Sequence, residues 1–247
     1  MSELAIKKIL ITGANGFIGG SLMRYYQNQD QDVVGVDLVG NGDDIVQGDI
    51  SQPDTISQQL QECDVIIHTA ALVSNAMQDS DMWRVNVLAT RNLIQAAKEH
   101  SVRRFVQISS IVAYGNSAKG EIDETHPVHA DGGSYVLTKL ASEHVVLSEQ
   151  ASDDIEVVII RPGDAYGPGS RPWIIAPLEA IAKNQFMLPE KGEGFFRPIY
   201  IDDLVRGIAM ASGHPDAAGE IFNFSCEGYM STKDYFTPHY NWLGKKG

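Results

Sequence analysis

Ile9-Leu10-Ile11-Thr12-Gly13-Ala14-Asn15-Gly16-Phe17-Ile18-Gly19 is the stretch that decides the fold of this chain. Its apolar, β-branched beginning predicts a buried strand, and residues 17–26 predict a helix. A glycine turn between the two suits a pyrophosphate, because glycines let the backbone approach the ligand and a helix N-terminus offers free N–H groups. The spacing Gly-x-x-Gly-x-x-Gly differs from the standard dinucleotide fingerprint. Its place at the first strand–helix junction nevertheless favours nucleotide binding.

The composition bounds the class of protein. The 247 residues suffice for one large domain or for a domain with a smaller appendage. The formal net charge of −13 argues against nucleic acid and anionic membranes as partners, and no apolar run reaches the length of a membrane span. We recognise no signal peptide, and Cys63 and Cys226 lack metal-ligand spacing. We therefore expect buried, reduced thiols, a cytoplasmic location and no metal site.

The acidic residue at the end of the second predicted strand, residues 32–37, indicates the cofactor. Asp37 lies 24 residues after Gly13, close to the distance at which such folds place a carboxylate against the adenosine ribose. A carboxylate accepts hydrogen bonds from a free 2′-hydroxyl and repels a 2′-phosphate. No Arg or Lys occurs between Arg24 and Arg84 to bind that phosphate. The sequence therefore favours NAD over NADP, the alternative being a solvated Asp at a strand end.

Strand and helix patterns alternate through most of the chain. The further predicted strands cover 45–50, 64–71, 104–110 and 155–162, and the further predicted helices cover 53–61, 81–100 and 134–149. This alternation predicts the α/β class, with a Rossmann-like, doubly wound parallel sheet. His68, within one of these strands, is expected to be packed rather than catalytic.

The composition changes past Gly163, where prolines and glycines accumulate. We therefore expect an NAD-binding domain over residues 1–163 and a small C-terminal substrate lobe over residues 164–247. Within the lobe, the pattern predicts a helix over 173–184, a strand over 198–201 and a helix over 202–211.

Ser110, Tyr135 and Lys139 form the constellation that carries chemistry. Tyr135 and Lys139 lie four residues apart on a predicted helix and share one face, and Ser110 ends a predicted strand. A free tyrosine, with a pKa of about 10, is a poor acid–base catalyst at neutral pH, and a nearby ammonium lowers that pKa. A serine hydroxyl can hold the substrate oxygen beside the phenol. The set can pass a proton while NAD gives or takes a hydride; alternatively, Tyr135 is an aromatic packed under a solvated lysine.

Together these motifs resemble the extended short-chain dehydrogenase/reductase superfamily, in its NAD-dependent epimerase/dehydratase branch. The matching residues follow the family's order and span nearly the whole chain: 12–19, 68–71, 86–87, 109–110 with 114–115, Tyr135-x-x-x-Lys139, 161–162 with 166–169, and 201–203. The resemblance implies NAD as cofactor and a small molecule as substrate. It also implies a homodimer that pairs through the helices at 83–100 and 134–149.

The resemblance further implies a role for each matched position. Ser110 would hold the active-site hydroxyl, Tyr135 would be the acid–base residue, and Lys139 would support it and reach the nicotinamide ribose. Gly13, Gly16 and Gly19 would contact the pyrophosphate. Asp37 would contact the adenosine ribose, and Asp49 and Ile50 would contact the adenine. The other implied cofactor residues are Asn15, Phe17, Ile18, Ala70, Ala71, Asn86 and Pro162. The implied substrate residues are Ser110, Tyr135, Asp164 and Arg197.

Departures from the family pattern narrow the reaction. Sugar-nucleotide dehydratases of this branch carry an Asp-Glu pair just after the active-site hydroxyl, where this chain has Ile111 and Val112. We therefore do not expect a dehydratase. Epimerases usually have an Asn where this chain has Asp164, and a carboxylate there repels a diphosphate. Arg197, in contrast, stands where epimerases place a phosphate-binding arginine, unless it forms only a surface salt bridge.

Residues 68–73 and 161–169 are more similar to the 3β-hydroxysteroid dehydrogenase-like subgroup, which acts on hydroxyl groups of apolar or mid-sized substrates. The residues that could line an apolar pocket, or else form the core of the lobe, are Trp173, Ile174, Phe186, Met187, Phe195 and Phe196. Relatives usually continue further than this chain, so its lobe is expected to be shorter than theirs.

Three functions stay open at this level. The favoured one is an NAD-dependent oxidoreductase that interconverts a secondary alcohol and a ketone. The alternative within the same family is a UDP-sugar 4-epimerase with tightly bound NAD, which would show no net NADH turnover. The third is a non-catalytic NAD-binding regulator, which the intact Ser-Tyr-Lys set argues against.

Overall fold

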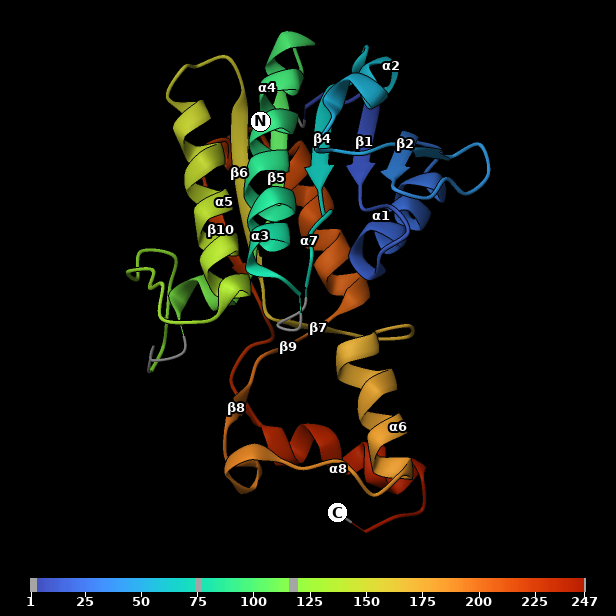
Figure 1. Cartoon of the computed structure of the whole chain (residues 1–247), viewed down its shortest axis with the longest axis vertical. Helices are drawn as coiled ribbons and strands as arrows, with labels where there is room; N and C mark the ends of the chain where they lie inside the picture. The colour runs from blue at the N-terminus through green and yellow to red at the C-terminus, as the bar shows by residue number, and fades with distance from the viewer. Residues whose placement is uncertain (1–3, 74–76, 116–119, 247) are drawn as a thin grey trace. The chain divides into compact units, whose positions relative to one another are not determined.

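A parallel β-sheet carries the glycine turn (Figure 1). The computed structural model describes residues 4–73, 77–115 and 120–246. The chain groups into two compact units. The first runs to Arg161 and includes Val205–Asn223, and the second consists of Pro162–Leu204 and the residues from Phe224 onward.

The sheet has seven strands in the described residues, in the order β3-β2-β1-β4-β5-β6-β10. Their bounds are Lys8–Thr12 for β1, Asp32–Asp37 for β2, Ile45–Gln47 for β3, Val65–His68 for β4, Arg104–Ile108 for β5, Glu156–Pro162 for β6 and Ile221–Phe224 for β10. Neighbours from β3 to β6 pair in parallel. The strand order reverses between β1 and β4, and doubly wound sheets bind ligands outside the carboxyl ends of the strands at such a point. The predicted fold class is confirmed.

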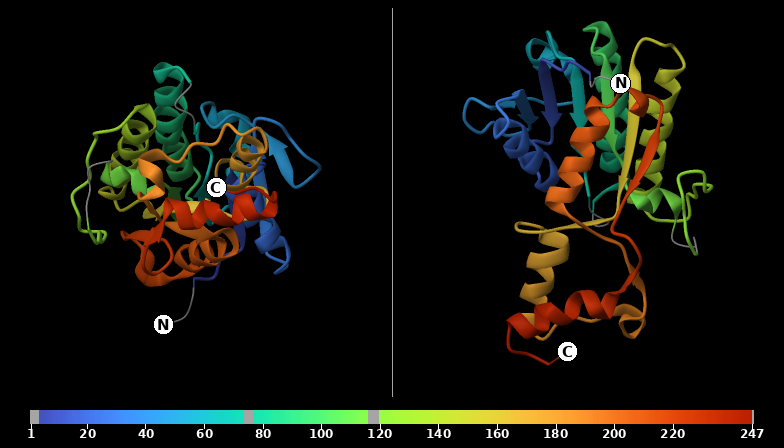
Figure 2. Two further views of the ribbon diagram at one scale, coloured as in Figure 1. Left: turned by 90° about the horizontal axis from the view of Figure 1, so that it is seen from below. Right: turned by 180° about the vertical axis from the view of Figure 1, so that it is seen from behind.

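Helices cover both faces of this sheet. The helices α3 (Asp79–Trp83), α4 (Thr90–Glu99) and α5 (Ser134–Gln150) lie on one face, and α1 (Phe17–Gln27) and α7 (Ile201–Gly213) lie on the other (Figures 1 and 2). The shorter turns of helix are η1 (Pro53–Ile56), α2 (Ser57–Leu60), η2 (Arg84–Ala89), η3 (Ile111–Tyr114) and η6 (Pro215–Ala217). Because both faces are covered, Leu10, Ile66 and Phe105 on the central strands are fully buried.

Some predicted elements differ from those observed. The helix predicted over 81–100 contains the wider π-helical turn η2 between α3 and α4. The strand predicted over 45–50 ends at Gln47, after which the Gly48 N–H donates to the carbonyl oxygen of Asp37. The sequence analysis missed β10, whose four half-buried residues carry too short a pattern to predict a strand.

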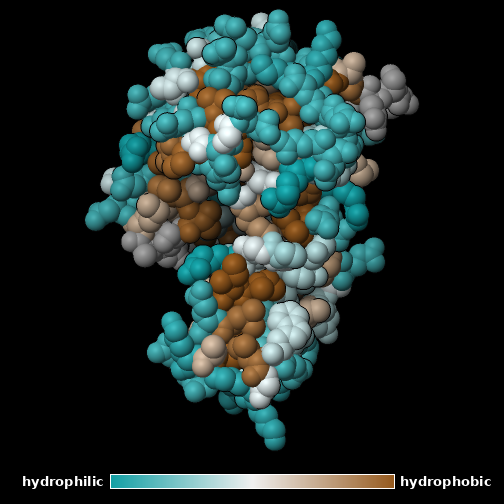
Figure 3. All heavy atoms as spheres, turned by 90° about the vertical axis from the view of Figure 1, so that its right-hand side faces the viewer, coloured by the Kyte–Doolittle hydropathy of each residue, from teal (hydrophilic) through white to brown (hydrophobic). Residues whose placement is uncertain are grey.

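The second unit has an aromatic core of its own. Its elements are β7 (Asp164–Tyr166), η4 (Arg171–Ile175), α6 (Ala176–Ala182), η5 (Pro189–Gly192), β8 (Phe195–Phe196), β9 (Pro198–Tyr200), β11 (Met230–Ser231) and α8 (Thr232–Trp242). Trp173, Phe186 and Phe196 pack in that core, whereas Met187 and Phe195 are 87% and 71% exposed. These five of the six candidates therefore do not line one pocket. Apolar residues are also exposed on the side of this unit where α6 lies (Figure 3).

The division of the chain differs from the predicted boundary at Gly163. That prediction placed all of residues 164–247 in one lobe, whereas Val205–Asn223 group with the sheet. The reason is that β10 extends the sheet beside β6 and that Arg104 on β5 donates to the carbonyl oxygens at the end of α7.

The cysteines differ from each other in their surroundings. Cys63 is buried, as expected, but Cys226 is exposed, so the expectation of two buried thiols is wrong for Cys226. Within the described residues, no cluster of His, Cys, Asp and Glu could hold a metal ion. No helix of the described part of the chain has the length and the apolar composition needed to cross a membrane.

Candidate active site

The turn between β1 and α1 leaves no room for a side chain at Gly13 or at Gly19. Gly13 has a φ of +69°, and a Cβ there would lie 2.8 Å from the Cα of Ala70. A Cβ on Gly19 would lie 2.2 Å from the carbonyl oxygen of Gly13. Both positions therefore require glycine, and the backbone itself forms the surface at the end of β1.

The N-terminus of α1 presents unpaired N–H groups beside this turn. Gly16 is the N-cap and supplies no side-chain bond, and the first intrahelical bond runs from the Gly20 N–H to the Gly16 carbonyl oxygen at 2.8 Å. The preceding N–H groups of Phe17, Ile18 and Gly19 are the orphan donors of the helix end. The first turn contains no acidic residue. The arrangement suits an anion, and the glycines and donors fit a pyrophosphate.

Asp37 lies at the end of β2, next to this turn. One carboxylate oxygen accepts the Asn15 N–H at 2.9 Å and the other accepts the Leu38 N–H at 2.8 Å. Each oxygen keeps lone-pair capacity, so Asp37 can still accept bonds from ribose hydroxyls. The Asn15 side chain donates to the Val39 carbonyl oxygen at 2.7 Å, which joins the glycine turn to the segment after β2.

A cavity of about 300 Å³ opens beyond Asp37. Its lining residues are Leu38, Gln47, Gly48, Asp49 and Thr55. Burial raises the pKa of Asp49, but hydrogen bonds from Ser51 outweigh it, so the pKa is lowered and the group is a carboxylate. Asp49, which the resemblance places near the adenine, lines this cavity, whereas the side chain of Ile50 is buried in the core of the sheet.

The structure brings Ser110, Tyr135 and Lys139 together at the end of β5. Ser110 is the N-cap of η3, and its side chain lies close enough to the Tyr135 phenol to act on the pKa of that phenol. Lys139 is 5% exposed; its Nζ lies 6.0 Å from the Tyr135 ring centroid and donates to the carbonyl oxygen of Ile108 at 2.9 Å. The helical spacing predicted this juxtaposition. The alternative of a solvated lysine is wrong, since Lys139 is buried.

The pKa values of this set differ in part from the expectation. Burial raises the pKa of Tyr135, with the Ser110 hydrogen bond acting the other way, so the expected lowering is not found. Burial also lowers the pKa of Lys139 to about 8, against the Glu143 carboxylate, which raises it. Tyr135 is therefore a phenol at neutral pH, in the form that donates a proton.

His68 is packed under the site, as expected. It is fully enclosed, with Nδ1 2.6 Å from the Thr12 hydroxyl and Nε2 2.9 Å from the Thr90 hydroxyl. Burial, followed by the charge of Lys139, lowers the pKa of His68 to about 3, so its ring is neutral. His68 thus ties β4 to β1 and to α4.

Asn86 holds the segment that follows β4. Its amide accepts the Leu72 N–H at 2.7 Å, and it donates to the Leu72 carbonyl oxygen and to the Thr138 hydroxyl, each at 3.0 Å. All its polar atoms have protein partners. Asn86 therefore positions the backbone after Ala70 and Ala71, both half-buried, rather than offering its own amide to a ligand.

The remaining predicted residues belong to the second unit. Pro162 ends β6, and Asp164 and Arg197 exchange bonds across the β7–β9 pair: the Arg197 N–H donates to the Asp164 carboxylate at 3.1 Å, and the Asp164 N–H donates to the Arg197 carbonyl oxygen at 2.7 Å. The Arg197 guanidinium lies 5.6 Å from the Phe195 ring centroid and donates to the carbonyl oxygen of Gly228. Among the described residues it forms no ion pair.

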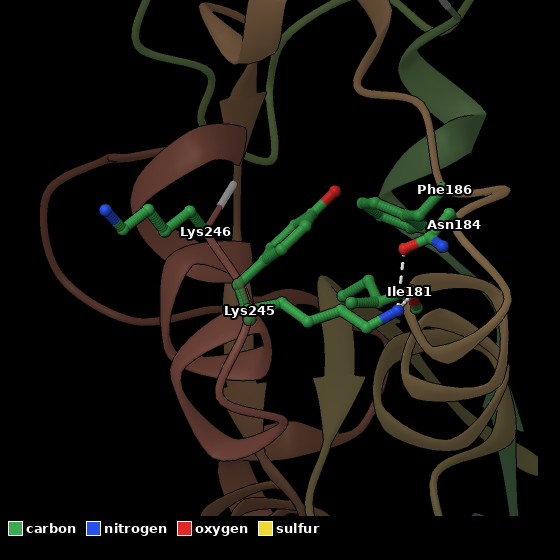
Figure 4. A pocket seen from close by; sticks show the side chains of 6 residues that line it. Ile181, Asn184, Phe186, Lys245 and Lys246 are labelled. Atoms are coloured by element: carbon green, nitrogen blue, oxygen red, sulfur yellow. Dashed lines mark hydrogen bonds between the residues drawn. The ribbon is translucent and has the colours of Figure 1, made fainter.

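A second cavity, of about 460 Å³, lies within the second unit and contains none of the predicted catalytic, cofactor or substrate residues, although Phe186 was a candidate for an apolar pocket (Figure 4). Its lining residues are Ile181, Asn184, Phe186, Tyr240, Lys245 and Lys246. The Lys245 ammonium donates to the carbonyl oxygens of Ile181 and Ala182 and to the Asn184 side chain. Its charge therefore caps the end of α6 and is not available to a ligand.

The sequence analysis missed two buried charges near the site. Glu143, one turn after Lys139, accepts a bond from the Ser109 hydroxyl at 2.5 Å and two bonds from the Arg161 guanidinium. The only available signal was the repeat of polar residues at 135, 139 and 143 along one face of a predicted helix. The partner Arg161 lies on another element, so its pairing was not visible in the sequence.

This chain is similar to known proteins of one enzyme family. The model of the NAD dependent epimerase/dehydratase family matches residues 9–225. A UDP-glucose 4-epimerase of Vibrio cholerae is 30% identical over 242 residues, which cover 92% of this chain and 73% of that protein. A 3 beta-hydroxysteroid dehydrogenase/Delta 5-->4-isomerase of Mycobacterium tuberculosis is 28% identical over 225 residues, which cover 84% of this chain and 60% of that protein.

A solved structure has the same fold over nearly the whole chain. It is that of UDP-glucuronic acid 4-epimerase from Bacillus cereus in complex with UDP-glucuronic acid and NAD. Its TM-score is 0.86 at 26% identity, with 97% of this chain and 84% of the other covered. Relatives of both the epimerase and the dehydrogenase kind thus match at similar identity.

Proposed function

The chain belongs to the NAD-dependent epimerase/dehydratase family, and on that premise we propose that it is an oxidoreductase that interconverts a secondary alcohol and a ketone. One observation carries the proposal: the Ser110 side chain at the end of β5 acts on the phenol of Tyr135, beside the buried ammonium of Lys139. Such a set supplies what carbonyl reduction demands of a protein, a hydrogen-bond donor and a proton source at one oxygen.

The cofactor of the family is NAD, and the residues of the first unit fit it. We propose that Gly13, Gly16 and Gly19 with the N–H groups of α1 hold the pyrophosphate, that Asp37 holds the ribose, and that the cavity at Asp49 takes the adenine. The carboxylate of Asp37 and the absence of a cation on β2 in the described residues support NAD over NADP. When bound, the nicotinamide supplies or accepts the hydride.

The protein's own groups would then handle the proton. The raised pKa of Tyr135 keeps its phenol protonated, so it donates to the ketone oxygen, while the Ser110 hydroxyl hydrogen-bonds the same oxygen. The ammonium of Lys139 stabilises the phenolate that this transfer leaves behind. In alcohol oxidation the same phenolate removes the hydroxyl proton.

Replacing Tyr135 by Phe tests this proposal. We expect the rate of NADH formation with a turned-over alcohol to fall by a factor of about 100 or more, because the proton carrier is lost. The binding constant for NAD should change little. The measurement is the absorbance at about 340 nm (the NADH band) with a panel of secondary alcohols, sterols and UDP-sugars, followed by calorimetry with NAD. NAD binding without turnover of any panel member would instead support a non-catalytic regulator.

A second candidate, a UDP-sugar 4-epimerase, is favoured by Arg197. Its guanidinium forms no ion pair with a described carboxylate, which leaves its charge for an anionic ligand such as a diphosphate. The carboxylate of Asp164 argues against an epimerase, because it accepts a hydrogen bond from the Arg197 N–H and would repel a diphosphate there. An NMR assay that shows a UDP-sugar changing configuration without net NADH would decide for the epimerase.

We also propose that the protein is a homodimer in the cytoplasm. Trp83 and Leu88 are 42% and 54% exposed on the helical segment from α3 to α4, where large apolar side chains suit a partner surface. The same segment packs beside α5, and family members are expected to pair through these two helices. The free thiols of Cys63 and Cys226 support a reducing compartment.

A further inference from the structure

Three successive turns of α5 contact the end of β5 through their side chains. The Tyr135 phenol lies beside the Ser110 side chain, which acts on it, and the Lys139 ammonium donates at 2.9 Å to the carbonyl oxygen just before Ser109. The third contact runs from the Ser109 hydroxyl to the Glu143 carboxylate at 2.5 Å. Residues four apart share one helix face, so these contacts form a ladder along α5. The first two rungs belong to the proposed active site, and the third has no assigned role.

In the third contact, the buried carboxylate of Glu143 is bonded by Ser109 on one side and by Arg161 on the other. Glu143 and Arg161 are 1% and 3% exposed, and the guanidinium donates to the two carboxylate oxygens at 3.0 and 2.7 Å. Arg161 also donates to the hydroxyl of Tyr114 at 2.8 Å. Tyr114 ends the turn η3, whose N-cap is Ser110. The Glu143 carboxylate is therefore connected to Ser110 through Ser109 and through Arg161 and Tyr114.

The charges around Lys139 give this carboxylate an electrostatic effect on the site. Tyr135 faces Lys139 from α5, neutral His68 faces it from β4, and Arg161 on β6 is paired with Glu143. Burial lowers the pKa of Lys139, and Glu143 acts against it. Among the described groups that act on Lys139, Glu143 is the carboxylate that favours the ammonium.

We propose that Glu143 is a positioning residue that fixes α5 against the end of β5 and keeps Lys139 charged beside Tyr135. The proposal rests on the proposed function, because a positioning role for Glu143 requires that Ser110, Tyr135 and Lys139 are the catalytic residues. The titration of Lys139 can be measured without any substrate. A wrong reaction assignment would therefore leave this test intact.

The first experiment compares Glu143→Gln with Glu149→Gln. Gln at position 143 keeps the shape and one oxygen acceptor but removes the charge, whereas Glu149 is a control on the same helix that pairs with Lys98. The measurement is the NMR shift of the Lys139 Cε carbon against pH in protein labelled with ¹³C-lysine, with Lys139→Met to assign the signal. We expect the midpoint in Glu143→Gln to fall by about half a pH unit or more. It should stay unchanged in Glu149→Gln.

A second variant covers the case in which Glu143→Gln does not fold, because the charge of Arg161 is then left buried without a carboxylate. The double variant Glu143→Met with Arg161→Met removes both charges, a change that buried ion pairs often tolerate. It should bind NADH in calorimetry with an affinity within about threefold of the parent, with a lowered Lys139 midpoint and a rate at least about tenfold lower. An unchanged Lys139 midpoint in either folded variant overturns the proposal, whatever the substrate proves to be.

Discussion

Asp164 shows how burial sets the chemistry of one residue. Burial in the second unit raises the pKa of its carboxyl from 3.8 to about 6, against a hydrogen bond from the Arg197 N–H. The folded chain therefore binds this proton more tightly than the unfolded chain does. Stability is then greatest below pH of about 4 for this group and falls as the pH rises toward 6, since ionisation favours the unfolded state.

Replacing Asp164 by Asn should remove that penalty. At pH 7 we expect the free energy of unfolding to rise by at most about 3 kcal/mol, because a shift of one pKa unit corresponds to about 1.4 kcal/mol. At pH 4 the two proteins should differ little. The measurement is the thermal midpoint at both pH values. Glu227→Gln, at an exposed carboxylate of the same unit, is the control and should show no such dependence. An equal difference at pH 4 and pH 7 would contradict the prediction.

Ser110, Tyr135 and Lys139 could be predicted at the residue scale, because their proximity follows from one helical spacing and one strand end. The state of Tyr135 could not. Its pKa depends on how completely the side chain is buried against its surroundings, and that outweighs the Ser110 hydrogen bond. A spacing of four residues states that two side chains share a face, but not what medium surrounds them.

The element that forms the proposed cofactor site is the strand, turn and helix from β1 to α1. Gly19 lies in the first turn of α1, where the backbone of Gly13 leaves no room for a methyl group. The close approach, rather than a general need for flexibility, explains the residue. The wide spacing of the glycines therefore still yields a backbone surface with free N–H groups at the helix end.

Gly19→Ala should disturb this surface. The added Cβ would lie 2.2 Å from the Gly13 carbonyl oxygen, so the turn must shift and carry the N–H donors with it. We expect the affinity for NAD, measured by calorimetry, to fall by a factor of about 10 or more, since 1.4 kcal/mol is tenfold. Gly213→Ala is the matched control, because a Cβ there meets only the Ile6 side chain at 3.9 Å. NAD affinity preserved in Gly19→Ala would argue against a pyrophosphate at this turn.

The segment after β4 illustrates an element whose role the sequence indicated only in part. Asn86 matched a family position and was expected to bind the cofactor. In the structure its amide instead clamps Leu72 and the hydroxyl of Thr138 on α5. The contribution of Asn86 to a cofactor site is therefore the shape of the backbone that it holds. This pairing joins residues 14 and 52 positions apart, beyond any local pattern.

At the scale of the whole molecule, helices on both faces of the sheet of the first unit carry exposed apolar side chains. Trp83 ends α3, Leu88 belongs to η2 and Met210 belongs to α7. Figure 2 shows α3, α4 and α5 on one face of the sheet and α7 on the other. Only the first surface coincides with the helices through which the family resemblance predicts pairing. A change of oligomeric state can therefore be assigned to one face.

Leu88→Glu should convert the proposed dimer to a monomer. A charge buried in an interface without a partner costs several kcal/mol, of the order of 2 to 5, so the dimer should dissociate at micromolar concentration. The measurement is the mass by light scattering after gel filtration, compared with the chain mass of 27.0 kDa. Met210→Glu, at a residue 73% exposed, should leave the mass unchanged. A parent protein that is already a monomer would contradict the dimer.

The sequence by itself determined what short-range rules govern. The glycine turn, the alternation of strands and helices, Asp37 at a strand end and the spacing of Tyr135 and Lys139 each follow from local geometry or a fixed period. Tertiary structure alone decided the rest. It added β10 to the sheet, paired Glu143 with Arg161, buried Lys139 and left Cys226 exposed. Those features depend on which distant segments meet and exclude water, and no local pattern in the chain records that meeting.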